Sequence, residues 1–249
     1  MLNRYSVNKN DYIAVYDSGI GGLNVLKLLK KYMPYENYLY FGDNKNAPYG
    51  NLNSESLLKL ATKNVKTLEN YGIKSVVLAC NTLSAVCYDK LAKRFKLKFI
   101  KTLPPLKHNV YNDKTYLICT ANTAKSAFVK KYKKNVKVVP ALTLASKIEN
   151  NVFNLNKVDD LIFKHLKNKD VSTLILGCTH YAFLLSKFVK ELNGVQIIQP
   201  EYLTMLCLND FLNENNLKND SSFDGKIRFI GENAFYNRYV YENFCLKKG

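Results

Sequence analysis

The sequence has no tryptophan and only six prolines and six cysteines in 249 residues. Six cysteines are too few for a disulfide scaffold, and no C-x-x-C pair indicates a structural zinc site. No apolar run approaches the roughly 18 residues that span a bilayer. The polar start MLNRYSVNKNDY lacks the apolar core of a signal peptide. We therefore expect a globular, cytoplasmic protein whose cysteines are mostly free thiols.

Acidic residues are scarce beside basic ones, because 37 lysines and arginines accompany only 20 aspartates and glutamates, for a formal charge of +17. Such an excess can mark a partner rich in phosphates, either a nucleic acid or an anionic membrane. The lysines are scattered beside apolar helix positions, however, and no RNA-binding signature or zinc finger accompanies them. We interpret the charge as a solvated basic surface that attracts small anionic substrates, and we expect no nucleic-acid or membrane partner.

Short apolar stretches alternate along the chain with helix-length amphipathic segments. The stretches that read as strands are residues 12–17, 37–42, 75–80, 98–102, 115–120, 136–140, 172–178, 195–200 and 226–231. This alternation is typical of an α/β protein whose parallel sheet is covered on both faces. Nine strands are many for one small sheet, so we predict two α/β halves. The consecutive prolines in Thr102-Leu103-Pro104-Pro105 mark the best break between them.

Small, polar or ionisable residues follow nearly every predicted strand. These strand ends are Asp17-Ser18-Gly19, Gly42-Asp43, Cys80-Asn81-Thr82, Thr120-Ala121-Asn122-Thr123 and Cys178-Thr179-His180. Ligands of open α/β sheets bind outside the carboxyl ends of the strands, so this clustering indicates a site. The glycine-rich turn after Asp17 matches no phosphate-binding motif, and its amides are suited to capping a helix or to holding a phosphate or a carboxylate.

Two cysteines occupy matching positions, in VVLACNTLSAV and LILGCTHYAFL. Cys80 and Cys178 each end an apolar strand and precede a helical pattern, and hydrogen-bonding side chains follow each of them. A cysteine at a helix N-terminus has its thiolate favoured by the helix dipole and the free amides, which lowers its pKa. We therefore expect both thiols to take part in chemistry rather than in core packing.

Three chemistries would use such a pair. A cysteine hydrolase needs one thiol, a histidine base and an orienting carboxylate, which leaves the second cysteine unexplained. Zinc suits Cys80, Cys178 and His180 as ligands, but no close ligand pair exists in the sequence. In racemisation, a thiolate removes a proton from carbon while a facing thiol delivers a proton to the opposite side. Two equivalent cysteines satisfy that last requirement best.

Five segments in this order resemble the cofactor-independent aspartate/glutamate racemase family, and most closely its glutamate racemases. They are DSGIGGLNVLKLL, YFGDNKNAPYG, LACNTLSAV, TANTAKSAFVKKY and LGCTHYAFLL, and GKIRFIGENAFYNRYVYENFC resembles the closing strand and helix of the family. The resemblance implies two pseudo-symmetric Rossmann-like or flavodoxin-like domains with mostly parallel sheets and the active site in the cleft between them. Residues 11–103 with 202–249 would form the first domain, 104–201 the second, and 1–10 an extra N-terminal tail.

The resemblance also implies roles for single residues. Cys80 and Cys178 would be the paired proton donor and acceptor, while Asp17 and His180 would each assist one thiol. Glu149 aligns with a carboxylate near the second cysteine. The implied substrate-binding residues are Asp17, Ser18, Tyr49, Gly50, Asn81, Thr82, Thr120, Thr123, Thr179 and His180. The threonines 120 and 123 would line the carboxylate side, and neither a cofactor nor a metal is implied.

The function expected from this resemblance is the racemisation of L-glutamate to D-glutamate, which supplies D-glutamate for peptidoglycan synthesis, by a protein that forms a homodimer. An aspartate racemase of the same family is the alternative, because nothing in the motifs measures the length of the substrate side chain. A further alternative is a non-catalytic protein that binds acidic ligands or DNA through its cleft or its basic face.

Overall fold

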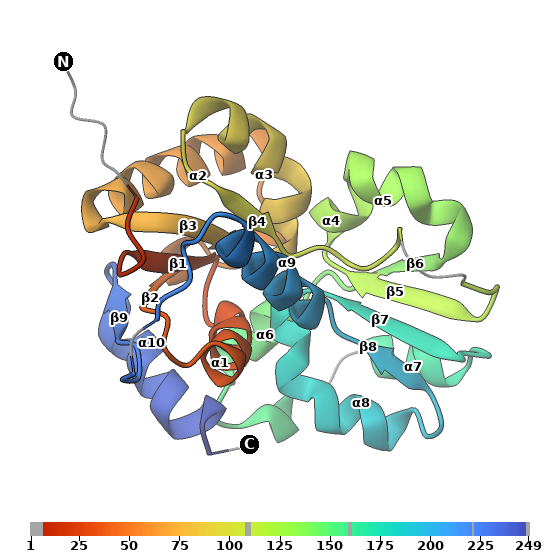
Figure 1. Ribbon diagram of the computed structural model, residues 1–249. Coiled ribbons are helices and arrows are strands. Elements are labelled where there is room, and N and C mark those ends of the chain that lie inside the picture. The colour runs from red at the N-terminus through yellow and green to blue at the C-terminus, as the bar shows by residue number, and fades with distance from the viewer. Residues whose placement is uncertain (1–6, 108–110, 159–160, 221, 248–249) are drawn as a thin grey trace.

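The computed structural model describes residues 7–107, 111–158, 161–220 and 222–247, so that Met1–Ser6 of the predicted tail lie outside the described residues. Each of the nine predicted stretches contains a strand, and the strands form two parallel sheets (Figure 1). The predicted α/β class is therefore confirmed. Among the described residues, no helix combines the length and apolar character that a membrane span requires.

The strands are short, and each ends close to its predicted boundary. Their bounds are β1 Tyr12–Asp17, β2 Tyr38–Gly42, β3 Ile73–Leu78, β4 Phe99–Lys101, β5 Thr115–Cys119, β6 Lys137–Pro140, β7 Thr173–Gly177, β8 Gln196–Ile198 and β9 Ile227–Ile230.

Helices connect the strands. The α-helices are α1 Gly22–Tyr32, α2 Ser54–Leu68, α3 Asn81–Arg94, α4 Ala121–Lys125, α5 Ala127–Tyr132, α6 Leu144–Asn150, α7 Leu161–Lys167, α8 Leu185–Glu191, α9 Glu201–Glu214 and α10 Ala234–Val240. Short 3-10 helices are η1 Asn44–Asn46, η2 Tyr49–Asn51, η3 Glu69–Tyr71, η4 Lys133–Asn135, η5 Leu155–Lys157 and η6 Thr179–Leu184, and η7 Tyr241–Cys245 is a π-helix.

The two sheets share one topology. The first has the order β4-β3-β1-β2-β9 and the second the order β6-β5-β7-β8, so β5 to β8 repeat the arrangement of β1 to β4. We call each sheet with its helices the first and the second half. In each half, the second strand lies on one side of the first strand, and the third strand lies on its other side. The crevice between the first and third strands is where ligands of such sheets bind.

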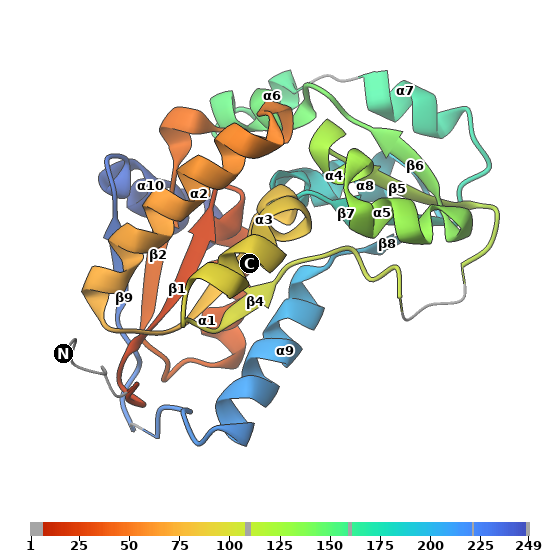
Figure 2. The ribbon, with the colours of Figure 1, turned by 90° about the horizontal axis from the view of Figure 1, so that it is seen from above.

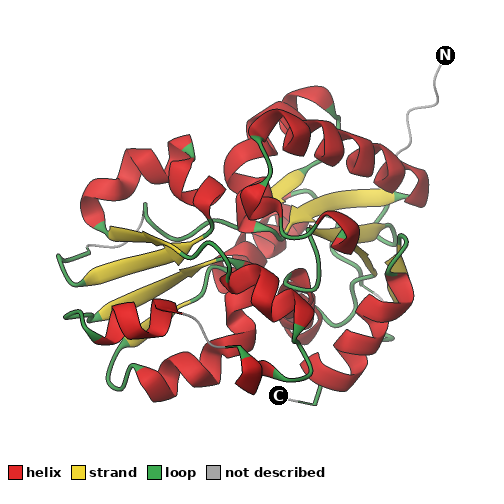
Figure 3. Ribbon diagram, turned by 180° about the vertical axis from the view of Figure 1, so that it is seen from behind, coloured by secondary structure: helices red, strands yellow, loops and turns green. Residues whose placement is uncertain are grey.

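Helices cover both faces of each sheet (Figures 2 and 3). In β1, Ile13 and Val15 join one buried apolar cluster while Ala14 and Tyr16 join another, because successive side chains of a strand point to opposite faces. This explains why the strand reads as a continuous apolar run rather than an alternating one. The first of these clusters continues into the second half, so that the two halves share part of their core.

The chain crosses between the halves twice, after β4 and after β8. The crossings lie side by side, because the hydroxyl of Thr204 near the start of α9 donates to Thr102 Oγ1 at 3.2 Å. Helix α9 then packs against α1, as Figure 1 shows, and the chain completes the first sheet with β9.

A buried ion pair lies near the amino-terminal ends of β2 and β3 in the first sheet. Lys74 Nζ lies 2.5 Å from Glu36 Oε2, and both side chains are almost fully buried. The same ammonium donates to the carbonyls of Lys9 and Leu217, while Glu36 Oε1 accepts from the amide of Asn219. One charge pair thus joins the N-terminal segment to the connection that follows α9.

Candidate active site

The predicted site residues gather where the carboxyl ends of β1 and β3 meet those of β5 and β7. Cys80 is the N-cap of α3, and Cys178 directly precedes η6. The helical pattern predicted after each cysteine is thus an α-helix after Cys80 and a 3-10 helix after Cys178. Both thiols are buried, with 6% of Cys80 and 7% of Cys178 exposed.

The surroundings of Cys80 come mostly from the first half. The amide of Leu83 and the hydroxyl of Ser18 hydrogen-bond to its sulfur, and the carboxyl group of Asp17 is close. Burial is the largest influence and raises the pKa of Cys80, and the nearby Asp17 raises it further, whereas the hydrogen bonds lower it. The sequence prediction of a lowered pKa is therefore wrong for Cys80. The loss of hydration outweighs the favourable helix N-terminus.

Asp17 links the two halves beneath this thiol. Its Oδ1 accepts from the amide of Gly19 at 3.0 Å, and its Oδ2 accepts from the hydroxyl of Thr179 at 3.2 Å. The carboxyl group is completely buried. Burial raises its pKa, although the charge of His180 and the hydrogen bonds act in the opposite direction. Asp17 is thus a carboxyl group with a raised proton affinity beside Cys80.

Cys178 lies at the end of a short relay. Its sulfur is 3.8 Å from His180 Nδ1, and His180 Nε2 is 2.5 Å from Glu149 Oε2. Burial lowers the pKa of His180, but the contacts with Cys178 and Glu149 outweigh it and hold that pKa well above its usual value. Burial likewise raises the pKa of Glu149, but the hydrogen bond and charge of His180 leave it lowered. The raised pKa of His180 favours the protonated ring, whose Nδ1 faces the Cys178 sulfur.

Glu149 is held by the first half as well as by His180. Its Oε2 accepts from the amide of Ile20 at 3.1 Å, and its Oε1 accepts from Asn44 Nδ2 at 2.7 Å. The carboxylate, which belongs to α6 of the second half, thus has all its described partners around the cleft. The structure places it at the cysteine near which the resemblance had aligned a carboxylate.

Three threonine hydroxyls form a buried triangle across the cleft. Thr82 Oγ1 lies 2.9 Å from that of Thr120 and 3.2 Å from that of Thr123, which are themselves 3.0 Å apart. A hydroxyl donates one hydrogen bond and accepts others, so the group can turn donors toward an anion.

Asn81 and Tyr49 differ in what they offer to the cleft. Asn81 Nδ2 donates to the carbonyl of Thr102, whereas its buried Oδ1 has no hydrogen-bond partner among the described residues. The hydroxyl of Tyr49 is 2.6 Å from Asp43 Oδ2 and 2.8 Å from the Tyr16 hydroxyl, inside the first half. Asn81 therefore has a free acceptor, while the phenol of Tyr49 is already bonded within the core.

The halves approach so closely that two glycines are needed. A Cβ atom on Gly50 would lie 2.5 Å from Thr120 Cβ, and one on Gly21 would lie 2.4 Å from Thr179 Oγ1. Distances below about 3 Å are not tolerated between such atoms, so a side chain at either position would force the halves apart.

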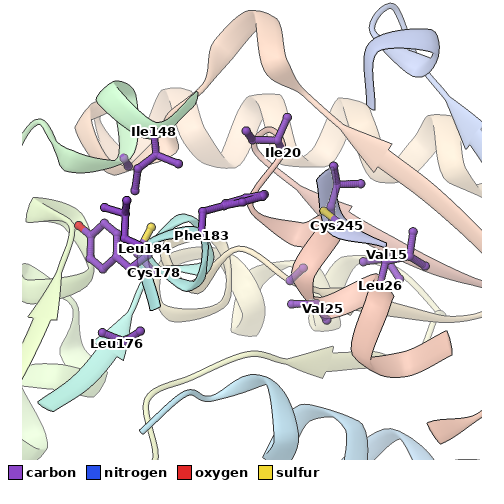
Figure 4. Close-up of a cluster of buried hydrophobic side chains, with 14 of the residues drawn as sticks. Val15, Ile20, Val25, Leu26, Ile148, Leu176, Cys178, Phe183, Leu184 and Cys245 are labelled. Carbon is purple, nitrogen blue, oxygen red and sulfur yellow. The ribbon is translucent and has the colours of Figure 1, made fainter. Parts of the chain in front are cut away.

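Apolar side chains surround the chemistry. Figure 4 shows Cys178 in one buried apolar cluster with Leu184, Ile148, Phe183 and Ile20, which come from both halves. These side chains keep water away from the sulfur, which strengthens the electrostatic interactions there. Among the described residues, no group of three histidine, cysteine or acidic side chains is placed to hold a metal ion.

Asn44, Asp43 and Asn122 also take part in the contacts around the cleft, although they were not among the predicted site residues. Asp43 and Asn122 lie within the polar strand ends, and Asn44 follows Asp43 directly. The feature of the sequence that could have identified them is their position after a strand. The partners of Asn44 and Asn122 could not be predicted, because these depend on how the halves face each other, whereas Asp43 bonds within the first half.

Comparisons with known proteins agree with this geometry. No family model matches the chain. A glutamate racemase of Clostridium botulinum (strain Alaska E43 / Type E3) is 35% identical over 240 residues, which is 91% of this chain and 93% of that protein. The crystal structure of a Bacillus anthracis glutamate racemase is 29% identical, covers 94% of each chain and has a TM-score of 0.80. The Francisella tularensis glutamate racemase in complex with D-glutamate is 27% identical, covers 94% of each chain and has a TM-score of 0.75.

Proposed function

The chain belongs to the glutamate racemase family, and on that premise we propose that it interconverts L- and D-glutamate by proton transfer between two cysteines. The observation that carries the mechanism is the placement of Cys80 and Cys178. They follow equivalent strands of two sheets with one topology, both are buried, and they lie close enough for Cys178 to influence the pKa of Cys80.

The reaction requires one base and one acid on opposite faces of Cα. The thiolate removes the α-proton as an S–H bond forms, and the electron pair of the broken C–H bond stays on the carbon. The opposite thiol then gives its proton to that carbon on the other face, which leaves a thiolate and inverts the centre. Positioned acid–base catalysis contributes roughly 100- to 10,000-fold, so electrostatic stabilisation supplies much of the remainder.

The surroundings of the two sulfurs differ. His180 Nδ1 faces the Cys178 sulfur, whereas burial raises the pKa of Cys80 and favours its neutral thiol. Cys80 is therefore suited to act first as the acid, which leaves the role of the base to Cys178. Asp17 beside Cys80 and His180 beside Cys178 assist the exchange of roles when the substrate enantiomer is reversed.

Other groups of the site complement an acidic amino acid. The free Oδ1 of Asn81 is an acceptor for the substrate ammonium group. The threonine hydroxyls at 82, 120 and 123 supply donors for a carboxylate. D-glutamate bound to the Francisella tularensis relative supports glutamate as the substrate.

We further propose the cellular role and organisation that the resemblance implies. The product D-glutamate supplies peptidoglycan synthesis in the cytoplasm, and the protein acts as a homodimer. Residues 11–103 with 202–249 form the first domain and 104–201 the second, with 1–10 as an N-terminal tail. The return of β9 to the first sheet supports this division.

One experiment tests the proposed reaction. The purified protein is incubated separately with L-glutamate, D-glutamate and L-aspartate in D2O, and optical rotation and deuterium at Cα are followed. We expect glutamate to racemise from either enantiomer with incorporation of deuterium. Turnover of aspartate alone would reassign the substrate, and binding of either acid without exchange at Cα would show a non-catalytic protein.

A further inference from the structure

The short helix η2 (Tyr49–Asn51) carries two of the predicted substrate residues and belongs to the first half. It contacts α4 of the second half, which in turn lies beside α3 (Figure 2). Gly50 in this turn is the glycine that makes room for Thr120. The turn is therefore a part of the first half whose position decides how closely the halves meet.

The side chain of Tyr49 fixes the turn to its own half. The phenol is completely buried and bonds to Asp43 and Tyr16, and Asn64 Nδ2 donates to both Asp43 Oδ2 and the Tyr49 hydroxyl. Asn64 belongs to α2, so three elements of the first half hold one ring. When the first half moves, the turn moves with it.

Among the described residues, one side chain of the second half hydrogen-bonds to the backbone of the same turn. Asn122 on α4 donates from Nδ2 to the carbonyl of Tyr49 at 3.1 Å and to the carbonyl of Leu52 at 2.5 Å. An amide nitrogen carries two hydrogens, so each carbonyl receives its own hydrogen bond. Asn122 spans the turn from its beginning to the residue after its end.

We propose that Asn122 is a positioning residue that fastens the η2 turn to the second half and so holds the cleft closed over the substrate. The proposal rests on the proposed function, because the closed cleft is the state that places both thiols about one glutamate. Asn122 does not belong to the acid–base machinery. Its effect reaches the substrate through Tyr49 and Gly50.

The size of the effect follows from the two hydrogen bonds. Each contributes a net stabilisation that is modest, and losing both raises the equilibrium constant for separation of the turn from α4 by about 5- to 100-fold. A ligand that binds only the closed state then has a weaker apparent affinity, in proportion to the closed fraction. The chemical step in the closed state keeps the same sulfurs and the same His180, so kcat changes much less than KM.

The test compares Asn122→Ala and Asn122→Asp with Lys125→Ala, an exposed position on the same helix. Asn122→Asp keeps the size of the side chain but replaces the donor by an acceptor that faces two carbonyls. Hydrogen–deuterium exchange of residues 49–53 is measured by mass spectrometry without substrate, and β3 serves as the reference segment. KM and kcat for L-glutamate are measured on the same preparations.

We expect both Asn122 variants to exchange residues 49–53 about 5- to 100-fold faster than the wild type, with Asn122→Asp at least as fast as Asn122→Ala. Exchange of β3 should stay unchanged, KM should rise several-fold and kcat should change less than twofold. Lys125→Ala should match the wild type in every measurement. These results together would support the fastening role.

Two results would overturn the proposal. One is exchange of residues 49–53 in both Asn122 variants at the wild-type rate. The other is a fall of kcat with no change in KM, which would place Asn122 in the chemistry. Failure of the proposed function looks different: the wild type would then leave glutamate unchanged, while the exchange measurements would still compare the variants.

Discussion

His180 Nε2 lies 2.5 Å from Glu149 Oε2, and the same carboxylate oxygen accepts the amide of Ile20 from the opposite half. Glu149 therefore has partners in both halves. Within the second half it contacts the imidazole whose other nitrogen faces Cys178, and it accepts a hydrogen bond from the first half where the site lies.

The pH dependence of stability should report this pair. The pKa of His180 is raised above 6.5, so its stabilisation is complete below that pH and is lost as pH rises through the folded-state pKa. The pKa of Glu149 is lowered from 4.5, so its stabilisation is present above that pH and is lost as pH falls through the folded-state pKa. The pair should therefore stabilise the folded state most between pH 4.5 and pH 6.5.

We expect Glu149→Gln to lower the free energy of unfolding by about 1–3 kcal/mol near pH 5.5 and by less at pH 9. Urea unfolding at the two pH values measures the difference. The control is Glu69→Gln at an exposed position, which should have little effect at either pH. An equal loss for Glu149→Gln at both pH values would contradict the charged pair.

Removal of either catalytic thiol should stop racemisation. Cys80→Ala and Cys178→Ala each delete one proton carrier, so we expect the rate to fall by at least roughly 100- to 10,000-fold. Circular dichroism of the glutamate solution follows the reaction. Cys87→Ala removes another buried thiol of α3 and should retain activity. Wild-type turnover by either of the first two variants would refute the two-thiol mechanism.

A side chain at Gly50 should keep the cleft from closing. The new Cβ of Gly50→Ala would lie 2.5 Å from Thr120 Cβ, so the turn or α4 must move away. We expect KM for glutamate to rise about tenfold or more, because only the closed fraction binds. Asn51→Ala changes an exposed neighbour in the same turn and should be neutral. An unchanged KM for Gly50→Ala would show that the contact can relax.

The buried charges of Lys74 and Glu36 should matter far more than an exposed pair. Lys74→Met leaves the Glu36 carboxylate buried without its partner, which costs about 3–5 kcal/mol of unfolding free energy. Lys114→Ala removes an exposed ion pair with Asp170 and should cost far less, because solvent screens that pair. Urea unfolding at neutral pH measures both. Similar losses for the two variants would mean that burial does not set the effect.

Much of the fold was predictable, because buried parallel strands are apolar throughout and are bounded by polar turns. Val76 and Val77 illustrate this, since both lie in a strand that is buried along its whole length. The strand ends also identified the region of the site. The carboxyl ends of parallel strands share one edge of the sheet, which brings Asp17 and Cys80 together.

What could not be predicted depends on the contact between the halves. The bonds of Asn122 to the η2 turn and of Asn44 to Glu149 join residues far apart in sequence, and no local pattern specifies them. The raised pKa of Cys80 has another origin. Its helix N-terminus is visible in the sequence, but the burial that outweighs it arises only when the chain packs around the thiol, mostly within the first half.

The position of β9 has a consequence for synthesis on the ribosome. This edge strand pairs with β2, yet it leaves the ribosome after all four strands of the second sheet. The nascent chain therefore contains all four strands of the second sheet while β2 still has an open edge. Such an edge is prone to pairing with other chains. Strand β9 closes that edge, so translation that stops before Ile227 leaves an aggregation-prone product.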